Sequence, residues 1–142
     1  MSHALNLAEQ AAANEEVPVG AVLIKNEQLI GEGSNAPIGS TDATAHAEIK
    51  TIRAACERVG NYRLPGTTLY LTLEPCAMCA GAIVHARIER VVIAAAEPRA
   101  GAAGSVFNVL ESPQLNHRCR VDWGLGEDRS RKLLQDFFRA RR

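Results

Sequence analysis

The most informative segment for the fold is Leu71–Gly81, which reads LTLEPCAMCAG. Its first residues end a β-rich run, and an apolar, alanine-rich run typical of a helix follows Pro75. Cys76 and Cys79 occupy positions i and i+3 at the start of this expected helix, which places both sulfurs on one face. Unpaired N–H groups at a helix start favour the thiolate. The pair therefore suits a redox couple or a metal site, and C-x-x-C alone does not separate the two.

On both sides of this stretch, strands alternate with helices along a chain of 142 residues, a length that suits one compact domain. This alternation after an opening hairpin predicts an α/β fold with a mixed five-stranded sheet and helices on both faces. Strands are expected at 17–24, 29–33, 67–73, 90–95 and 119–123, and helices at 4–14, 44–59, 76–86 and 129–142. The segment GAAGS, residues 101–105, is typical of a flexible turn.

The composition is that of a soluble globular protein, with 46% hydrophobic and 23% charged residues. No apolar run approaches the length of a membrane span, and the opening MSHALNLAEQAAANEE lacks the pattern of a signal peptide. We therefore expect a cytoplasmic protein without a membrane partner. Disulfides are rare in that compartment, so cysteines at this spacing indicate metal or redox chemistry.

The charge is zero overall but unevenly distributed. The 16 basic and 16 acidic residues argue against a general nucleic-acid binder with a basic surface. However, residues 129–142 hold six basic and one acidic residue, a charge of +5, which leaves 10 basic and 15 acidic residues, or −5, in residues 1–128. This basic end fits either a localised anionic partner or a helix whose last turn carries the cations that its dipole favours.

The segment TAHAEIK, residues 44–50, separates the metal from the redox interpretation. Zinc takes imidazole and thiolate readily, so His46, Cys76 and Cys79 make three good ligands. The other histidines and cysteines lie off these helix faces or in no motif: His3, Cys56, His85, His117 and Cys119. Three ligands leave one position open for water, as in catalytic zinc sites, where the pKa of the water falls to about 7.

Glu48 has a possible task beside such a metal, because a carboxylate can take a proton from the water and hand it to a leaving group. Residues two apart in a helix point about 200° away from each other, so His46 and Glu48 can approach one metal only from the first turn. By itself, H-x-E would indicate a core histidine and a surface glutamate. Its combination with P-C-x-x-C across an expected strand favours the zinc site.

The combination H-x-E…P-C-x-x-C is the signature of the zinc deaminases, which the chain resembles from end to end. More narrowly, it resembles the bacterial tRNA-specific adenosine deaminases of the TadA type. The similar stretches are EVPVGAVLI, GEGSNAPIGSTDATAHAEI, NYRLPGTTLYLTLEPCAMCAGAIVHARIERVV, GAAGS, NHR and DFFRARR. The resemblance implies a cytidine-deaminase-like three-layer α/β/α sandwich. It also implies a single zinc-dependent deaminase domain over residues 1–142, with one Zn²⁺ per subunit.

The resemblance implies a hydrolytic reaction on the wobble adenosine of a tRNA anticodon loop. Zinc-bound hydroxide would attack carbon 6 of the flipped adenine, ammonia would leave, and inosine would remain. His46, Cys76 and Cys79 match the zinc ligands of the family, and Glu48 matches its proton shuttle. The resemblance further implies a set of substrate-binding residues: Val17, Asn35, the backbone N–H of Ala47, Leu73, Glu74 and Pro75.

The resemblance also implies contacts with the anticodon stem-loop and a homodimer. An anticodon loop exposes unstacked bases and few phosphates, so a neutral protein with one basic end is adequate. The residues expected to contact RNA are Glu97, Arg99, Phe138, Arg139, Arg141 and Arg142. We expect one of Phe137 and Phe138 to pack the last helix onto the body instead.

Two alternatives stay open. The first is a deaminase of a free nucleobase or nucleoside, of the guanine or cytosine type, on the same fold and metal. The second is a structural zinc or thiol-redox module without hydrolytic activity, which requires a fourth protein ligand or a Cys76–Cys79 disulfide.

Overall fold

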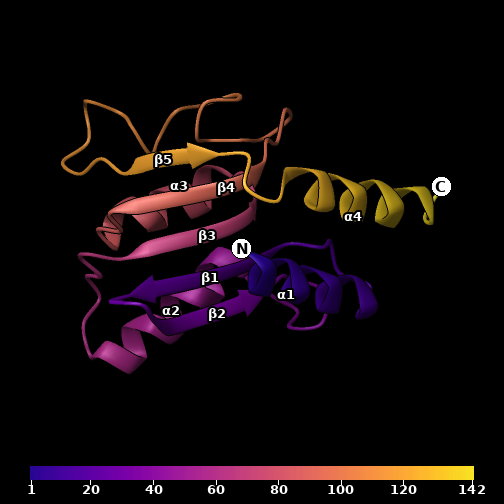
Figure 1. Ribbon diagram of the computed structural model, residues 1–142, viewed down its shortest axis with the longest axis horizontal. Helices are drawn as coiled ribbons and strands as arrows, with labels where there is room; N and C mark the ends of the chain where they lie inside the picture. Colours follow the sequence, from indigo (N-terminus) through magenta and orange to yellow (C-terminus); the bar gives the residue numbers. More distant parts are fainter.

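The computed structural model describes residues 1–142, in which five strands form one mixed sheet with the order β2-β1-β3-β4-β5 (Figure 1). The strands are β1 (Gly20–Lys25), β2 (Gln28–Ser34), β3 (Thr68–Leu73), β4 (Arg90–Ala95) and β5 (Arg120–Trp123). The helices are α1 (Ser2–Ala13), α2 (Ala47–Val59), α3 (Ala77–His85) and α4 (Glu127–Arg139). The type and order of all nine elements agree with the sequence expectation.

The helices cover both faces of the sheet. Helices α2 and α3 lie side by side behind it in Figure 1, and α1 lies on the opposite face, where it also contacts α4. The arrangement confirms the three-layer α/β/α sandwich. No helix combines the length and the apolar character needed to cross a membrane.

The directions of the strands determine which loops meet. Strand β1 runs antiparallel to β2 and β3, while β3, β4 and β5 run parallel to one another. The carboxyl ends of β2, β3, β4 and β5 therefore share one edge of the sheet, which we call the carboxyl edge. Four connections leave from this edge: residues 35–46 lead into α2, residues 74–76 lead into α3, residues 96–105 follow β4, and residues 124–126 lead into α4.

The centre of the sheet is apolar and fully buried. Leu71 of β3 pairs with Ala21 of β1 on one side and with Ile93 of β4 on the other, and none of the three is exposed to solvent. Burial of such side chains stabilises the fold by about 1.5–3 kcal/mol each for the larger ones. This core fixes the strand ends and, with them, the carboxyl edge.

Two glycines allow the helices to approach the sheet backbone closely. A Cβ atom on Gly20 would lie 2.0 Å from the carbonyl oxygen of Ala4 in α1. On the other face, a Cβ atom on Gly31 would lie 2.6 Å from the carbonyl oxygen of Thr51 in α2. Any larger residue at either position would push a helix away from the sheet.

Several element boundaries differ from the expected ones, and three of the differences have clear local reasons. Strand β1 begins at Gly20, because the Val19 N–H donates to the Val17 carbonyl in a tight turn. Helix α2 begins three residues later than expected, since His46 has extended backbone angles, φ −76° and ψ 154°. Helix α4 begins earlier, at Glu127, after Gly126 in the left-handed conformation with φ 79°.

The expectation for the paired phenylalanines is confirmed. Phe137 is 8% exposed and packs α4 onto the body, whereas Phe138 is 47% exposed.

Candidate metal centre

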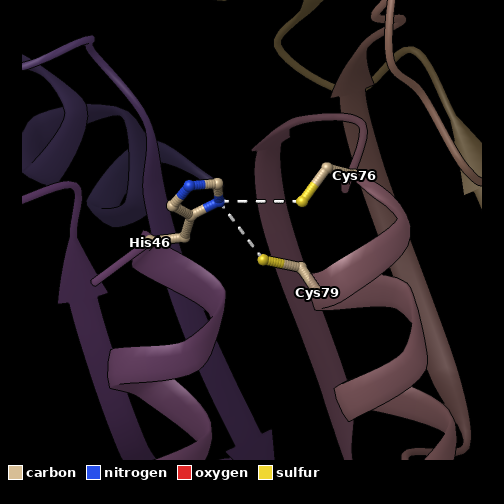
Figure 2. A group of neighbouring side chains, drawn as sticks. All are labelled: His46, Cys76 and Cys79. Atoms are coloured by element: carbon tan, nitrogen blue, oxygen red, sulfur yellow. Dashed lines mark hydrogen bonds between the residues drawn. The ribbon is translucent and has the colours of Figure 1, made fainter. Parts of the chain in front are cut away.

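The starts of α2 and α3 lie beside each other at the carboxyl edge and bring three ligand-type side chains together (Figure 2). His46 is the N-cap residue of α2, Cys76 is the N-cap residue of α3, and Cys79 lies in the first turn of α3. The Nδ1 atom of His46 is 3.7 Å from the Cys76 sulfur and 3.4 Å from the Cys79 sulfur. Figure 2 shows the imidazole facing both sulfurs across the gap between the two helices.

The spacing of these atoms fits a tetrahedral metal. Zinc bonds of about 2.3 Å to sulfur and about 2.0 Å to nitrogen place a nitrogen and a sulfur about 3.5 Å apart at the tetrahedral angle. The distances from His46 Nδ1 lie on either side of this value, and all three ligand atoms are within 4.8 Å of one another. The group contains no fourth histidine, cysteine or acidic residue. The donor set is therefore compatible with zinc and leaves one coordination position open.

The surroundings of the two thiols shift their pKa values in opposite directions. The interaction with the Cys79 side chain lowers the pKa of Cys76 to about 5, against an opposing effect of burial, and backbone N–H groups of the α3 start add to the decrease. The same interaction raises the pKa of Cys79, which burial and the neighbouring Glu48 raise further. Cys76 is thus the first thiol to ionise, and a bound cation would replace the remaining proton.

Glu48 lies in the first turn of α2 and is 4% exposed. The Cys79 thiol donates to its Oε2 over 3.0 Å. Burial raises the pKa of Glu48 despite this hydrogen bond. His46 and Glu48 can approach the centre together because His46 lies just outside the helix, as expected from their separation of two residues.

Asn35, which follows β2, binds the start of α2. Its Oδ1 accepts the Ala47 N–H over 3.0 Å. The Ala47 N–H, which we expected to contact substrate, is therefore engaged by Asn35 in this structure. Val17 and Leu73, the two expected apolar walls, are half-buried against the main core.

Glu74 is turned toward a loop of its own chain. It is 3% exposed, and its carboxylate accepts the N–H groups of Glu97, Ala103 and Ser105 over 3.0, 2.9 and 3.1 Å, together with the Ser105 hydroxyl. Burial acts to raise the pKa of Glu74, but these hydrogen bonds outweigh it and hold the pKa below its usual value. The carbonyl of Pro75 accepts the Ala102 N–H over 2.8 Å. Sequence reasoning missed Ser105, because no local pattern connects it to Glu74.

A groove of about 760 Å³ runs between the loop after β4 and helix α4. It brings together four of the six residues expected to contact RNA, and with them a further arginine of the basic C-terminal end: Arg99, Phe138, Arg139 and Arg142, with Arg131. Arg131 pairs with Glu127 over 2.7 Å, and Arg139 lies 3.8 Å from Asp136, whereas Arg99 and Arg142 have no acidic partner. The groove is therefore basic.

The other two residues expected to contact RNA lie outside the lining of this groove. The Glu97 side chain accepts the Arg99 N–H over 2.9 Å and so shapes one wall from behind. Arg141 folds back onto its own helix, where its guanidinium stacks 3.5 Å above the Phe137 ring and donates to the Phe137 carbonyl.

Comparisons with known proteins agree with this geometry. The family model for MafB19-like deaminases matches residues 1–142. The tRNA-specific adenosine deaminase of Haemophilus influenzae is 46% identical over 143 residues, which cover 100% of this chain and 83% of that protein.

Two solved structures are also similar. One, from work on A-to-I editing by tRNA deaminases at the wobble position of transfer RNA, has a TM-score of 0.90 and 43% identity, covering 94% of this chain and 100% of the other. A guanine deaminase from Bacillus subtilis has a TM-score of 0.66 and 36% identity, covering 84% of this chain and 79% of the other. The chain therefore belongs to the MafB19-like deaminases and, among them, to the family of the tRNA-specific adenosine deaminases.

Proposed function

We propose that this protein hydrolytically deaminates the wobble adenosine of a tRNA anticodon loop, giving inosine and ammonia. The observation that carries the proposal is the three-ligand donor set with a buried carboxylate beside it, in a chain of this family. His46, Cys76 and Cys79 would hold one Zn²⁺ per subunit. When bound, zinc would lower the pKa of water at its open position to about 7 and so supply a nucleophile at neutral pH.

Glu48 is the proton shuttle in this proposal. Cys79 can act as a ligand only as the thiolate, so metal binding removes the one side-chain donor that Glu48 has. The freed carboxylate takes a proton from the attacking water and delivers it to the ring nitrogen beside carbon 6. The second proton then passes by the same route to the departing amine, which leaves as ammonia. Burial supports this role, because it raises the pKa of Glu48 toward the pH at which the group must both accept and donate.

Asn35 is proposed to orient the flipped base. Its Oδ1 already accepts the Ala47 N–H, which leaves the amide NH₂ to donate to an acceptor on the purine ring. Val17 and Leu73 offer apolar surface at the rim of the core for the faces of the base. The target base must leave the stack to reach such a site, and an unstacked anticodon loop makes this step easy.

The basic groove is proposed to hold the RNA strand that flanks the flipped base. The exposed ring of Phe138 can stack on a base, while Arg99 and Arg142 are free to contact phosphates. If so, the dependence of RNA affinity on salt should weaken in an Arg99→Ala, Arg142→Ala variant, with the slope of log K against log salt reduced by about 0.7 per lost phosphate contact. We further propose a cytoplasmic homodimer, as the resemblance implies.

The proposal is tested with the zinc-loaded protein and an anticodon stem-loop that carries adenosine at the wobble position. Inosine is measured by mass spectrometry, with a stem-loop of the same composition but adenosine elsewhere in the loop as the control. We expect inosine from the first RNA and little from the second. Equal conversion of both RNAs would contradict wobble specificity.

A free-base deaminase is the second candidate, because the chain is also similar to a guanine deaminase. Turnover of free guanine or cytosine, together with no inosine from either RNA, would favour it.

A further inference from the structure

Glu74 stands at the junction between the metal centre and the basic groove. It follows the last residue of β3 directly and precedes the candidate ligand Cys76 by two positions. None of the ion pairs in the structure involves Glu74, so its charge is balanced entirely by backbone N–H groups and one hydroxyl. A buried carboxylate without a basic partner needs such a set of donors.

The donors all come from residues 97–105, which we call the clamped loop. Oε1 of Glu74 accepts the Glu97 N–H and the Ser105 hydroxyl, and Oε2 accepts the N–H groups of Ala103 and Ser105. The loop wraps around the carboxylate so closely that a Cβ atom on Gly101 would lie 2.3 Å from the carboxyl carbon. The segment 101–105, expected to be a flexible turn, is thus tied down from both ends.

Two backbone contacts join the same pieces of chain. The Glu74 N–H donates to the Ala95 carbonyl over 2.9 Å, and the Ala102 N–H donates to the Pro75 carbonyl over 2.8 Å. The end of β3, the end of β4 and the clamped loop therefore form one hydrogen-bonded unit, to which the helix start with both cysteines is directly attached.

The clamped loop also forms one wall of the basic groove. Pro98 and Arg99 line the groove, and the Arg99 N–H is held by the side chain of Glu97, whose own N–H is held by Glu74. A chain of two hydrogen bonds thus leads from the Glu74 carboxylate to the backbone of a groove arginine.

We propose that Glu74 is a positioning residue, which sets the clamped loop, and with it Arg99, at a fixed place relative to the metal-ligand turn. The inference rests on the proposed function for its meaning in substrate binding, but the clamp itself can be tested without substrate. Its consequence is that the distance between the flipped base and the flanking RNA contacts is fixed within the protein before RNA binds.

The amide substitution distinguishes this role from simple space filling. A glutamine has the shape of glutamate, but it has one acceptor oxygen and an NH₂ group that donates. In Glu74→Gln, two of the four donors would therefore face another donor. The matched control is Glu16→Gln, because Glu16 is also 3% exposed and accepts backbone N–H groups of a carboxyl-edge loop, those of Ile38 and Gly39.

The clamp is tested first by amide hydrogen exchange of the zinc-loaded protein. In Glu74→Gln we expect exchange to become at least about tenfold faster at Glu97, or at Ala103 and Ser105, with the zinc content unchanged, since the backbone amides on the side that the NH₂ group takes lose their acceptor. Glu16→Gln should leave residues 97–105 as they are in the wild type. Unchanged protection of the clamped loop in Glu74→Gln would overturn the inference, whatever the activity.

The positioning role is tested next by kinetics on the anticodon stem-loop. We expect Glu74→Gln to raise KM by about tenfold, because small displacements of positioning groups have effects of this order or larger. The kcat should fall less than KM rises, as when a binding interaction is lost. In an Arg99→Ala background, the same substitution should change KM by no more than about twofold, since the group that it positions is gone. The effect of Glu16→Gln should stay independent of Arg99.

Each remaining result decides one question. Wild-type protein that forms no inosine would contradict the proposed function, and the exchange experiment would still decide the clamp. Inosine from the wild type, with effects of Glu74→Gln and Arg99→Ala on KM that multiply independently, would overturn the positioning role alone.

A second variant tests the same role if Glu74→Gln does not fold. Ser105→Ala removes only the hydroxyl donor, and it should raise KM by about threefold with the same dependence on Arg99. Its KM remaining at the wild-type value would then overturn the inference.

Discussion

Two buried carboxylates lie at the carboxyl edge of the same sheet, and their surroundings are opposite. Glu48, in the first turn of α2, is 4% exposed and receives one side-chain hydrogen bond, from the Cys79 thiol. Glu74, in the turn after β3, is 3% exposed and receives four. Burial raises the pKa of Glu48, whereas the hydrogen bonds of Glu74 outweigh burial and lower its pKa.

Two carboxylates that are buried to the same degree can therefore differ in pKa, because they receive different numbers of hydrogen bonds. A carboxylate with many donors is held ionised and fixed, which suits a structural anchor. A carboxylate with one donor, which metal binding would remove, is left able to exchange protons. We therefore assign proton transfer to the carboxylate at the start of α2 and positioning to the carboxylate in the turn after β3.

The largest expected effect separates the two glutamates by turnover. Glu48→Gln should lower the rate of inosine formation by about 10²–10⁴-fold while one zinc per subunit remains, because a proton shuttle contributes about that much. Single-turnover kinetics and metal analysis measure the two quantities. Glu57→Gln, on the exposed face of the same helix, is the control and should behave as the wild type. Activity of Glu48→Gln within about tenfold of the wild type would contradict the role of Glu48 as the proton shuttle.

The next largest effect is a difference in stability between the variants of the two glutamates. In the metal-free protein, Glu74→Gln should lower the free energy of unfolding by about 1–3 kcal/mol, because it leaves buried donors unsatisfied. Glu48→Gln should leave it equal or higher, since burial of that charge is poorly compensated. Denaturant unfolding of both variants measures the difference, and equal losses in the two would contradict it.

The pH dependence of stability should have opposite signs at the two sites. The folded-state pKa of Glu74 is lowered from 4.5, so its stabilisation is present above pH 4.5 and is lost as the pH falls through the folded-state value. The folded-state pKa of Glu48 is raised from 4.5, so stability is lost as the pH rises from 4.5 to the folded-state value. Unfolding of the metal-free protein between pH 3 and pH 7 should therefore show the wild type losing its advantage over Glu74→Gln in acid. If the difference in unfolding free energy between the wild type and Glu74→Gln stays constant with pH, the lowered pKa of Glu74 would be contradicted.

The smallest effect sharpens the count of donors at Glu74. Ser105→Ala removes the hydroxyl but keeps the Ser105 N–H, so the free energy of unfolding should fall by only about 1 kcal/mol. A loss as large as that of Glu74→Gln would mean that the hydroxyl alone carries the clamp.

Much of the fold and the metal centre could be predicted from the sequence, because both depend on local patterns. The alternation of strands and helices predicted all nine elements, and the two short motifs predicted which side chains meet at His46 and Cys76. The helix starts place the residues within each motif, and the residue types, an imidazole and two thiolates that suit one zinc ion, predicted that the two motifs meet.

The anchor at Glu74 could not be predicted, because its partners, 23 to 31 residues away, are backbone N–H groups and one serine hydroxyl, which form no recognisable motif. Nothing in the local sequence tells whether a glutamate after a strand faces a substrate or a loop. Arg131 was not singled out as an RNA contact for a similar reason: it joins the groove because α4 packs against β4. Such contacts depend on tertiary packing, which periodicity does not encode.

The most direct measurement of the central claim is one turnover of the wobble-adenosine stem-loop in water labelled with oxygen-18, by the zinc-loaded wild type and by Glu48→Gln. We expect the wild type to form inosine with one labelled oxygen at carbon 6 and Glu48→Gln to form almost no inosine in the same time. Unlabelled inosine, or equal yields from the two proteins, would contradict a hydrolytic reaction in which Glu48 carries the proton.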